Sequence, residues 1–170
     1  TLMAILISPM IVPLIITSAG MFFFYSKVGL THTYLGLILA HTALGTPFVV
    51  ITVTATLTGF DTNLIRASQS LGADTMRTFF KVIMPLILPG VISGGLFAFI
   101  TSFDEVVVVM FIGSVEQITI PKQMWAGLRQ ETSPVILCMA TCLVALSIGL
   151  LTTVEMLRRR SERLRGIKQR

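Results

Sequence analysis

Long apolar runs alternate along the sequence with shorter polar segments. Four of these runs hold about twenty residues or more, which is enough for a helix to cross a hydrocarbon core of roughly 30 Å. They are residues 2–25, 34–57, 84–112 and 134–157. This pattern predicts an all-α fold, a polytopic membrane bundle with four helices in this stretch of chain.

Polar composition divides the chain further. We expect residues 1–60 to hold the first two membrane helices, 61–83 a polar loop, 84–157 the last two helices with an outer amphipathic loop at 113–133, and 158–170 a basic tail. Cytoplasmic flanks of membrane helices retain Lys and Arg. Three basic residues fall in 61–83 and seven in the tail, against one or two in each other loop. The polar loop and the tail are therefore predicted to be cytoplasmic, and four crossings place Thr1 on that side too.

Composition supports a membrane protein and excludes a soluble domain. The 170 residues are 54% hydrophobic and 12% charged, with a mean hydropathy of +0.86. The net charge of +5 is concentrated in the tail, so it favours contact with anionic membrane lipid over nucleic acid. The apolar run starts at Thr1 without an initiator Met or a basic leader. We therefore expect this sequence to be the C-terminal fragment of a longer chain.

The polar loop at 61–83 predicts two short helices joined by a bend. Asp61, Thr62 or Asn63 is a suitable helix cap, and Gly72 interrupts the apolar stripe that follows. Glycine tolerates a tight turn or a close backbone contact, so the bend is expected at Gly72. The alternative is an ordinary connecting loop without a specific partner.

Several features inside the predicted spans leave two interpretations open. Pro9, Pro13 and Pro47 each free a backbone carbonyl, which indicates either a cavity-lining helix or a simple packing kink. Gly90 and Gly94 form a G-x-x-x-G face for close helix contact, within this chain or between chains. Beyond them, Trp125 belongs to a short amphipathic stretch expected at the outer interface, as an anchor or as a docking face.

Asp104 and Glu105 are adjacent carboxylates at predicted membrane depth. Charges there are costly unless they face protein or water, so they are candidates for a substrate pathway. Neighbouring helix positions point about 100° apart, so only one of the two is expected to face a given spot. With Thr101 and Ser102 as supporting hydrogen-bond partners, such a carboxylate would favour a cationic substrate. A structural carboxylate bonded within the bundle is the alternative.

Signatures of enzymes and cofactor sites are missing from the sequence. It contains no G-x-x-x-x-G-K-[ST] for ATP binding and no H-E-x-x-H for zinc. Cys138 and Cys142 share a helix face but have no His or further Cys nearby to form a metal site. His41 is interpreted as a hydrogen-bonded bundle histidine with no carboxylate beside it. We therefore expect no catalytic residue, no metal and no cofactor.

The polar loop resembles a known coupling motif. Arg66-Ala67-Ser68, then Gly72-Ala73, Phe79 or Phe80, and the Pro85, Pro89 and Gly90 that follow are similar to the EAA loop of ABC-importer permeases. The resemblance implies a cytoplasmic helix that docks into a groove of an ATP-binding subunit. The docking residues it implies are Arg66, Ala67, Ser68, Leu71, Gly72, Ala73, Phe79, Phe80 and Pro85. Arg66 stands where the family usually has an acid, and Ser68 where it has a second small residue.

A second resemblance concerns the remainder of the chain. The stretch from Phe99 to Val107 and the later Ile120-Pro121 are similar to the spermidine/putrescine branch of these permeases. This implies the last four of six helices of a type I importer permease in the bacterial inner membrane. It also implies alternating access, a second permease subunit, a dimer of ATP-binding subunits and a periplasmic substrate-binding protein. Amino acids or opine-like solutes are alternative substrates. An ion channel or an intramembrane enzyme that uses Asp104 or Glu105 is the alternative of another class.

Overall fold

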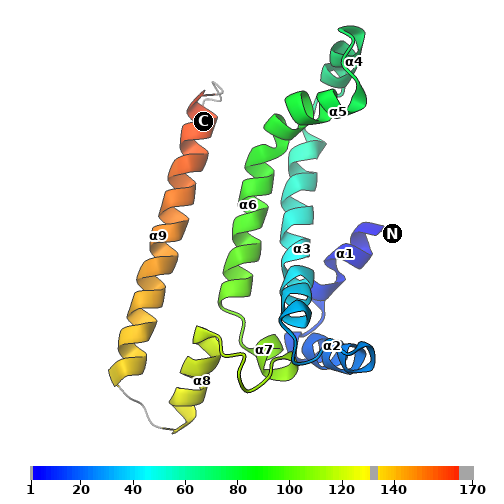
Figure 1. Ribbon diagram of the computed structural model, residues 1–170. Coiled ribbons are helices and arrows are strands. Elements are labelled where there is room, and N and C mark those ends of the chain that lie inside the picture. Colours follow the sequence, from blue (N-terminus) through cyan, green and yellow to red (C-terminus); the bar gives the residue numbers. More distant parts are fainter. Residues whose placement is uncertain (1, 131–133, 165–170) are drawn as a thin grey trace.

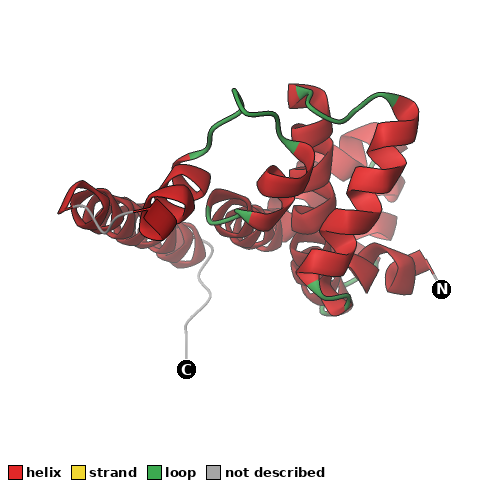
Figure 2. Cartoon of the chain, turned by 90° about the horizontal axis from the view of Figure 1, so that it is seen from below, coloured by secondary structure: helices red, strands yellow, loops and turns green. Residues whose placement is uncertain are grey.

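The computed structural model describes residues 2–130 and 134–164, and these residues form helices and loops without a strand (Figures 1 and 2). The elements are α1 (Leu2–Ile11), α2 (Leu14–Val28), α3 (Tyr34–Thr58), α4 (Asn63–Ser70), α5 (Thr75–Thr78), the π-helical turn η1 (Phe79–Ile83), α6 (Met84–Phe103), α7 (Val107–Ile112), α8 (Ile120–Gln130) and α9 (Pro134–Leu164). The predicted all-α class is confirmed.

Three helical stretches in the described part of the chain are long and apolar enough to cross a membrane. They are Tyr34–Thr58, Thr75–Phe103 and Pro134–Thr153. A fourth crossing exists if the bent pair α1 and α2 counts as one broken span. In Figure 1, α4 and α5 lie at the same end of the molecule as the C-terminal end of α9. Helices α2, α7 and α8 lie at the opposite end.

The first predicted span, residues 2–25, is not one straight helix. The described segments on either side of Val12 and Pro13 are bent by 112°. Pro13 adopts an extended backbone (φ −53°, ψ 132°), and a proline disfavours helical geometry at the residue before it. Near the break, the Ser8 hydroxyl donates to the carbonyl of Ile5, which Pro9 leaves without its helical partner. Thr1, predicted to be cytoplasmic, lies outside the described residues.

Helices α3 and α6 pack closely along a glycine face. A Cβ on Gly94 would lie 2.7 Å from Val49 Cα and would also meet the Thr52 hydroxyl. A Cβ on Gly90 would lie 3.0 Å from the carbonyl oxygen of Thr52. Of the two interpretations of the G-x-x-x-G face, the structure therefore favours a contact within this chain.

A substitution of Gly94 tests this contact. We expect Gly94→Leu to destabilise the folded protein by about 1–3 kcal/mol, because overpacking forces the backbones apart. Gly95→Leu is the matched control, since a Cβ on Gly95 meets nothing within 4 Å. Thermal unfolding of the purified full-length protein in detergent measures both variants. Equal unfolding temperatures for the two would contradict the close approach of α3 and α6.

The buried core lies at the end opposite α4 and α5. It joins side chains from α2, α3 and α7, with Met21 and Leu30 packed against its edge. The core residues are Tyr25, Leu37, Ala40, Leu44, Val108, Val109 and Ile112. This cluster holds the short helix α7 against α3.

The third predicted span, residues 84–112, is also divided. Helix α6 ends at Phe103, and α7 begins as a separate helix at Val107. The Glu105 carboxylate accepts a hydrogen bond from the Val108 backbone N–H at 2.8 Å and so satisfies a free amide at the start of α7. Asp104 and Glu105 thus lie at a helix break, where the apolar run alone predicted continuous helix.

Helix α9 lies to one side of the other spans, against α6 and α8 (Figures 1 and 2). No residue of its apolar window is buried. The helix runs to Leu164, so the first part of the predicted tail at 158–170 continues α9 as helix. Residues 165–170 lie outside the described part of the chain.

Candidate functional site

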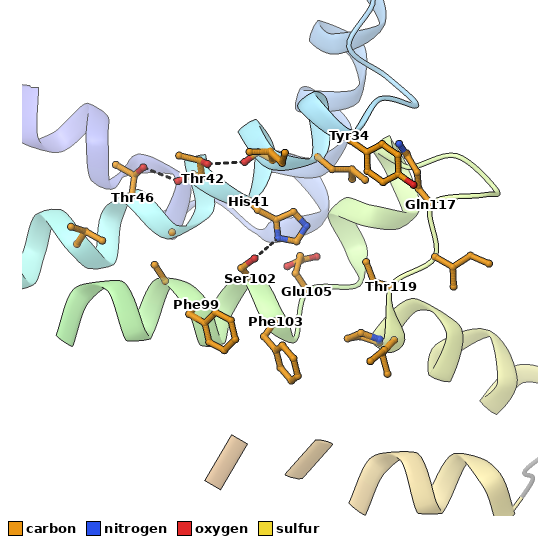
Figure 3. Close-up of a pocket in the computed structure, with 18 of the residues that line it drawn as sticks. Tyr34, His41, Thr42, Thr46, Phe99, Ser102, Phe103, Glu105, Gln117 and Thr119 are labelled. Carbon is orange, nitrogen blue, oxygen red and sulfur yellow. Dashed lines mark hydrogen bonds between the residues drawn. The ribbon is translucent and has the colours of Figure 1, made fainter. Parts of the chain in front are cut away.

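A groove of about 950 Å³ lies between α3, the end of α6 and the loop before α8 (Figure 3). It lies toward the end of the bundle that carries α7 and α8. Its walls are largely apolar, with polar groups at a few places. The lining residues are Tyr34, Leu37, Ile38, His41, Thr42, Gly45, Thr46, Val49, Val50, Ala98, Phe99, Ser102, Phe103, Glu105, Glu116, Gln117, Ile118, Thr119, Ile120 and Pro121.

His41 and Ser102 connect the two long helices across this groove. The Ser102 hydroxyl and His41 Nδ1 lie 2.9 Å apart in a hydrogen bond between α6 and α3. Glu105 lies beside the imidazole (Figure 3) and interacts with it electrostatically. The expectation that His41 has no carboxylate beside it is therefore wrong, because the break after α6 turns Glu105 back toward α3. Three polar side chains meet at one point of the groove.

The two adjacent carboxylates have different surroundings. Glu105 is 6% exposed and lines the groove, with one oxygen bonded to the amide of Val108. Asp104 caps the end of α6, is exposed and does not line the groove. Thr101 is also absent from the lining, and its hydroxyl donates to the carbonyl of Phe97 in its own helix. Of the three residues predicted for a substrate pathway, Ser102 and Glu105 are brought together and Asp104 is not.

The loop that closes one side of the groove is held by side-chain bonds. Lys122 Nζ donates to the carbonyl oxygens of Ser114 (2.9 Å) and Gln117 (3.2 Å). Gln117 Oε1 accepts from the Ser114 amide, and its Nε2 donates to the carbonyl oxygen of His32 at 3.4 Å. These two bonds direct the Lys122 ammonium to the loop backbone. Lys122 is not among the residues that line the groove.

Sequence reasoning missed several groove residues. The sequence predicts His41 only as a hydrogen-bonded bundle histidine, and it does not distinguish Thr42 or Thr46 from the other small polar residues of α3. Thr42 and Thr46 are spaced i, i+4 from one another, and this spacing places them on one helix face. That signal was available, but nothing in the sequence indicated which face borders a cavity.

The polar segment at the opposite end folds as helix, bend and helix. Gly72 has φ +82°, a left-handed conformation that favours glycine, so the predicted turn is present. After the turn, Asp74 accepts from the Arg77 amide at 2.7 Å and caps α5. Ser68 and Thr78 are both buried, and their hydroxyls lie 3.0 Å apart in a hydrogen bond that joins α4 to α5. Ser68 thus lies inside this segment and is not part of its outer surface.

Large apolar side chains cover the outside of the segment. Leu71 is 89% exposed, Met76 66% and Phe80 57%. A cleft of about 450 Å³ beside Met76 and Phe80 is lined by Gly72, Asp74, Met76, Arg77, Phe80 and Lys81. Of the other residues that the resemblance implicated, Arg66, Ala67 and Phe79 are exposed, while Ala73 and Pro85 are half-buried. Apolar groups of this size exposed together are typical of a protein-binding surface.

No group of three or more metal-binding side chains occurs among the described residues. Cys138 and Cys142 are both exposed on α9.

The spans, the groove and the polar segment together define the class of protein. It is a multi-spanning helical membrane protein with a groove near one end and an exposed apolar and basic segment at the other.

The family is shown by comparison with known proteins. Residues 1–163 match the family described as "Binding-protein-dependent transport system inner membrane component". The chain belongs to this family, so it is an inner membrane component of a transport system rather than an enzyme.

Individual relatives are similar over most of this chain. It is 30% identical over 152 residues to the spermidine/putrescine transport system permease protein PotC of Haemophilus influenzae, covering 89% of this chain and 59% of the relative. It is 27% identical over 172 residues to the putrescine transport system permease protein PotI of Escherichia coli, covering 95% of this chain and 60% of the relative. The chain thus spans about three fifths of the length of these relatives.

Proposed function

We propose that the chain is part of a permease subunit of an ATP-driven importer, and that it passes polyamines such as spermidine or putrescine through the groove by alternating access. The observation that carries this proposal is the charge of the groove. Its lining includes the carboxylates Glu105 and Glu116 and, among the described residues, no Lys or Arg. A polyamine carries ammonium groups separated by methylene chains, which suits a mostly apolar groove with carboxylates. The names of the relatives point to the same substrate class.

The remaining walls suit the methylene chain and the charge of such a substrate. Phe99 and Phe103 both line the groove, and their rings lie stacked with centroids 5.6 Å apart (Figure 3). Aromatic faces attract cations through their quadrupole and also cover apolar surface. Glu105 is the buried charge of the site, so it makes the strongest electrostatic contribution.

We further propose that the segment at 61–83 transmits the closure of the ATP-binding subunits. Exposed Leu71 and Phe80 form its apolar contact surface, with Arg77 and Lys81 at the edge of the cleft. The buried bond between Ser68 and Thr78 joins α4 to α5, which supports movement of the segment as one piece. A docked rigid segment moves together with the ATPase and shifts a two-state bundle between its inward-open and outward-open forms. The proposed partners are a dimer of ATP-binding subunits, a second permease subunit and a periplasmic substrate-binding protein.

The alternatives fit the groove less well. An amino acid or an opine-like solute carries a carboxylate, which the Glu105 and Glu116 carboxylates would repel. A channel would have no use for the large apolar side chains exposed on the segment at 61–83. Neither alternative explains both ends of the molecule.

Transport by the full-length importer tests the proposal. The complex with its ATP-binding subunits is reconstituted in liposomes with the matching binding protein, and uptake of radiolabelled putrescine and spermidine is compared with that of glutamate and alanine. We expect ATP-dependent uptake of the polyamines and none of the amino acids. Uptake of the amino acids without the polyamines would refute the proposed substrate class.

A further inference from the structure

We propose that Thr42 and Thr46 on α3 form an acceptor-only subsite of the groove. This subsite binds the second ammonium group of a diamine whose first ammonium group lies at Glu105. The inference rests on the proposed function and adds to it the residues that distinguish a diamine from an amino acid.

The hydroxyl protons of these two threonines are already used within α3. Thr42 Oγ1 donates to the carbonyl of Ile38 at 2.7 Å, and Thr46 Oγ1 donates to the carbonyl of Thr42 at 2.7 Å. A threonine hydroxyl has one proton and two lone pairs. In this arrangement each oxygen has only lone pairs left for a ligand, so it can accept a hydrogen bond but cannot donate one.

Thr42 and Thr46 line the same groove as Glu105. Figure 3 shows Thr46, Thr42 and His41 in succession on α3, with Glu105 beyond His41. Thr42 and Thr46 are one helical turn apart, or about 6 Å along the axis. A ligand that extends from Glu105 along α3 therefore passes the two hydroxyl oxygens in turn.

The wall between the two ends suits an alkyl chain. Gly45 approaches α6 so closely that a Cβ there would lie 2.9 Å from the Cβ of Ala98. Phe99 of α6 also lines the groove and is 47% exposed. The α3 and α6 backbones thus form a narrow apolar floor between the two threonines and the polar cluster of His41, Ser102 and Glu105.

Acceptor-only oxygens discriminate by hydrogen-bond chemistry. An ammonium group at the far end of a ligand finds acceptors there, while a carboxylate would face lone pairs with no proton to share. A diamine therefore satisfies both ends of the groove, and an amino acid satisfies only one.

Valine substitutions remove the oxygens and keep the branched shape. In the full-length importer in liposomes we expect the Thr42→Val/Thr46→Val double variant to lower the uptake efficiency for putrescine by roughly tenfold, since hydrogen bonds to charged groups are among the stronger ones. The serine variants Thr42→Ser and Thr46→Ser keep the oxygen and are expected to transport within about twofold of wild type, because a serine hydroxyl offers the same lone pairs.

Thr58→Val is the matched control. Thr58 lies on the same helix and makes the same kind of bond, to the carbonyl of Thr54 at 2.9 Å, but it does not line the groove. We expect its uptake to be unchanged. Wild-type uptake by the double valine variant, or an equal loss in Thr58→Val or in the serine variants, would overturn the subsite. If the wild-type importer moves no putrescine at all, the proposed function fails together with the subsite.

Discussion

Glu105→Gln is expected to lower polyamine uptake by the assembled importer by roughly tenfold to a hundredfold, because hydrogen bonds to charged groups contribute about 1.5–3 kcal/mol each. The glutamine amide oxygen still accepts the bond from the Val108 amide, so α7 keeps its first turn. The substitution therefore removes the charge at the proposed substrate site and keeps the shape of the side chain. Uptake of labelled spermidine and putrescine in liposomes measures the loss.

Asp104→Asn is the matched control for this charge. It removes a carboxylate one residue away that is exposed and does not line the groove. We expect Asp104→Asn to transport at the wild-type rate, and both variants to assemble with the ATP-binding subunits. A loss in Asp104→Asn with normal uptake in Glu105→Gln would place the pathway outside the groove.

Gly72→Val is expected to lower uptake by roughly tenfold while the complex still assembles, because a side chain in the left-handed region costs about 1–2 kcal/mol and a β-branched residue is especially unfavourable there. A Cβ on Gly72 would meet nothing within 4 Å, so the effect comes from the backbone and not from a clash. The turn between α4 and α5 opens, and the segment no longer presents Leu71 and Phe80 together. ATP hydrolysis stimulated by the binding protein and uptake are measured in the same liposomes.

Two substitutions distinguish an effect of the turn conformation at Gly72 from an effect of added side-chain volume. Gly72→Asn adds a side chain that tolerates φ > 0, so we expect it to retain most of the uptake. Gly59→Val adds the same side chain as the test variant at the end of α3, where φ is −93° and nothing lies within 4 Å. Normal coupling in Gly72→Val, or an equal defect in Gly59→Val, would show that the conformation at Gly72 does not transmit the ATPase motion.

The helix breaks show where sequence reasoning reached its limit. Residues 84–112 are apolar almost throughout, and hydropathy alone does not register that α6 ends at Phe103. The break depends on Glu105 capping α7 and on the core that holds α7 against α3. Pro13 in the sequence indicates the first break, but a proline is equally compatible with a kink inside a continuous helix. Pro47 is an example, because it lies within the unbroken helix α3.

The sequence by itself determined the all-α class, the long apolar helices and the turn at Gly72. These follow from local composition, since hydropathy selects spanning helices and glycine adopts φ > 0 without the steric cost of a Cβ. The tertiary structure decided which polar groups share a site. It brought His41, Ser102 and Glu105 together and left Asp104 outside the groove. The physical reason is that the direction of a side chain at a helix end depends on what the next helix packs against, and residues distant in sequence supply that packing.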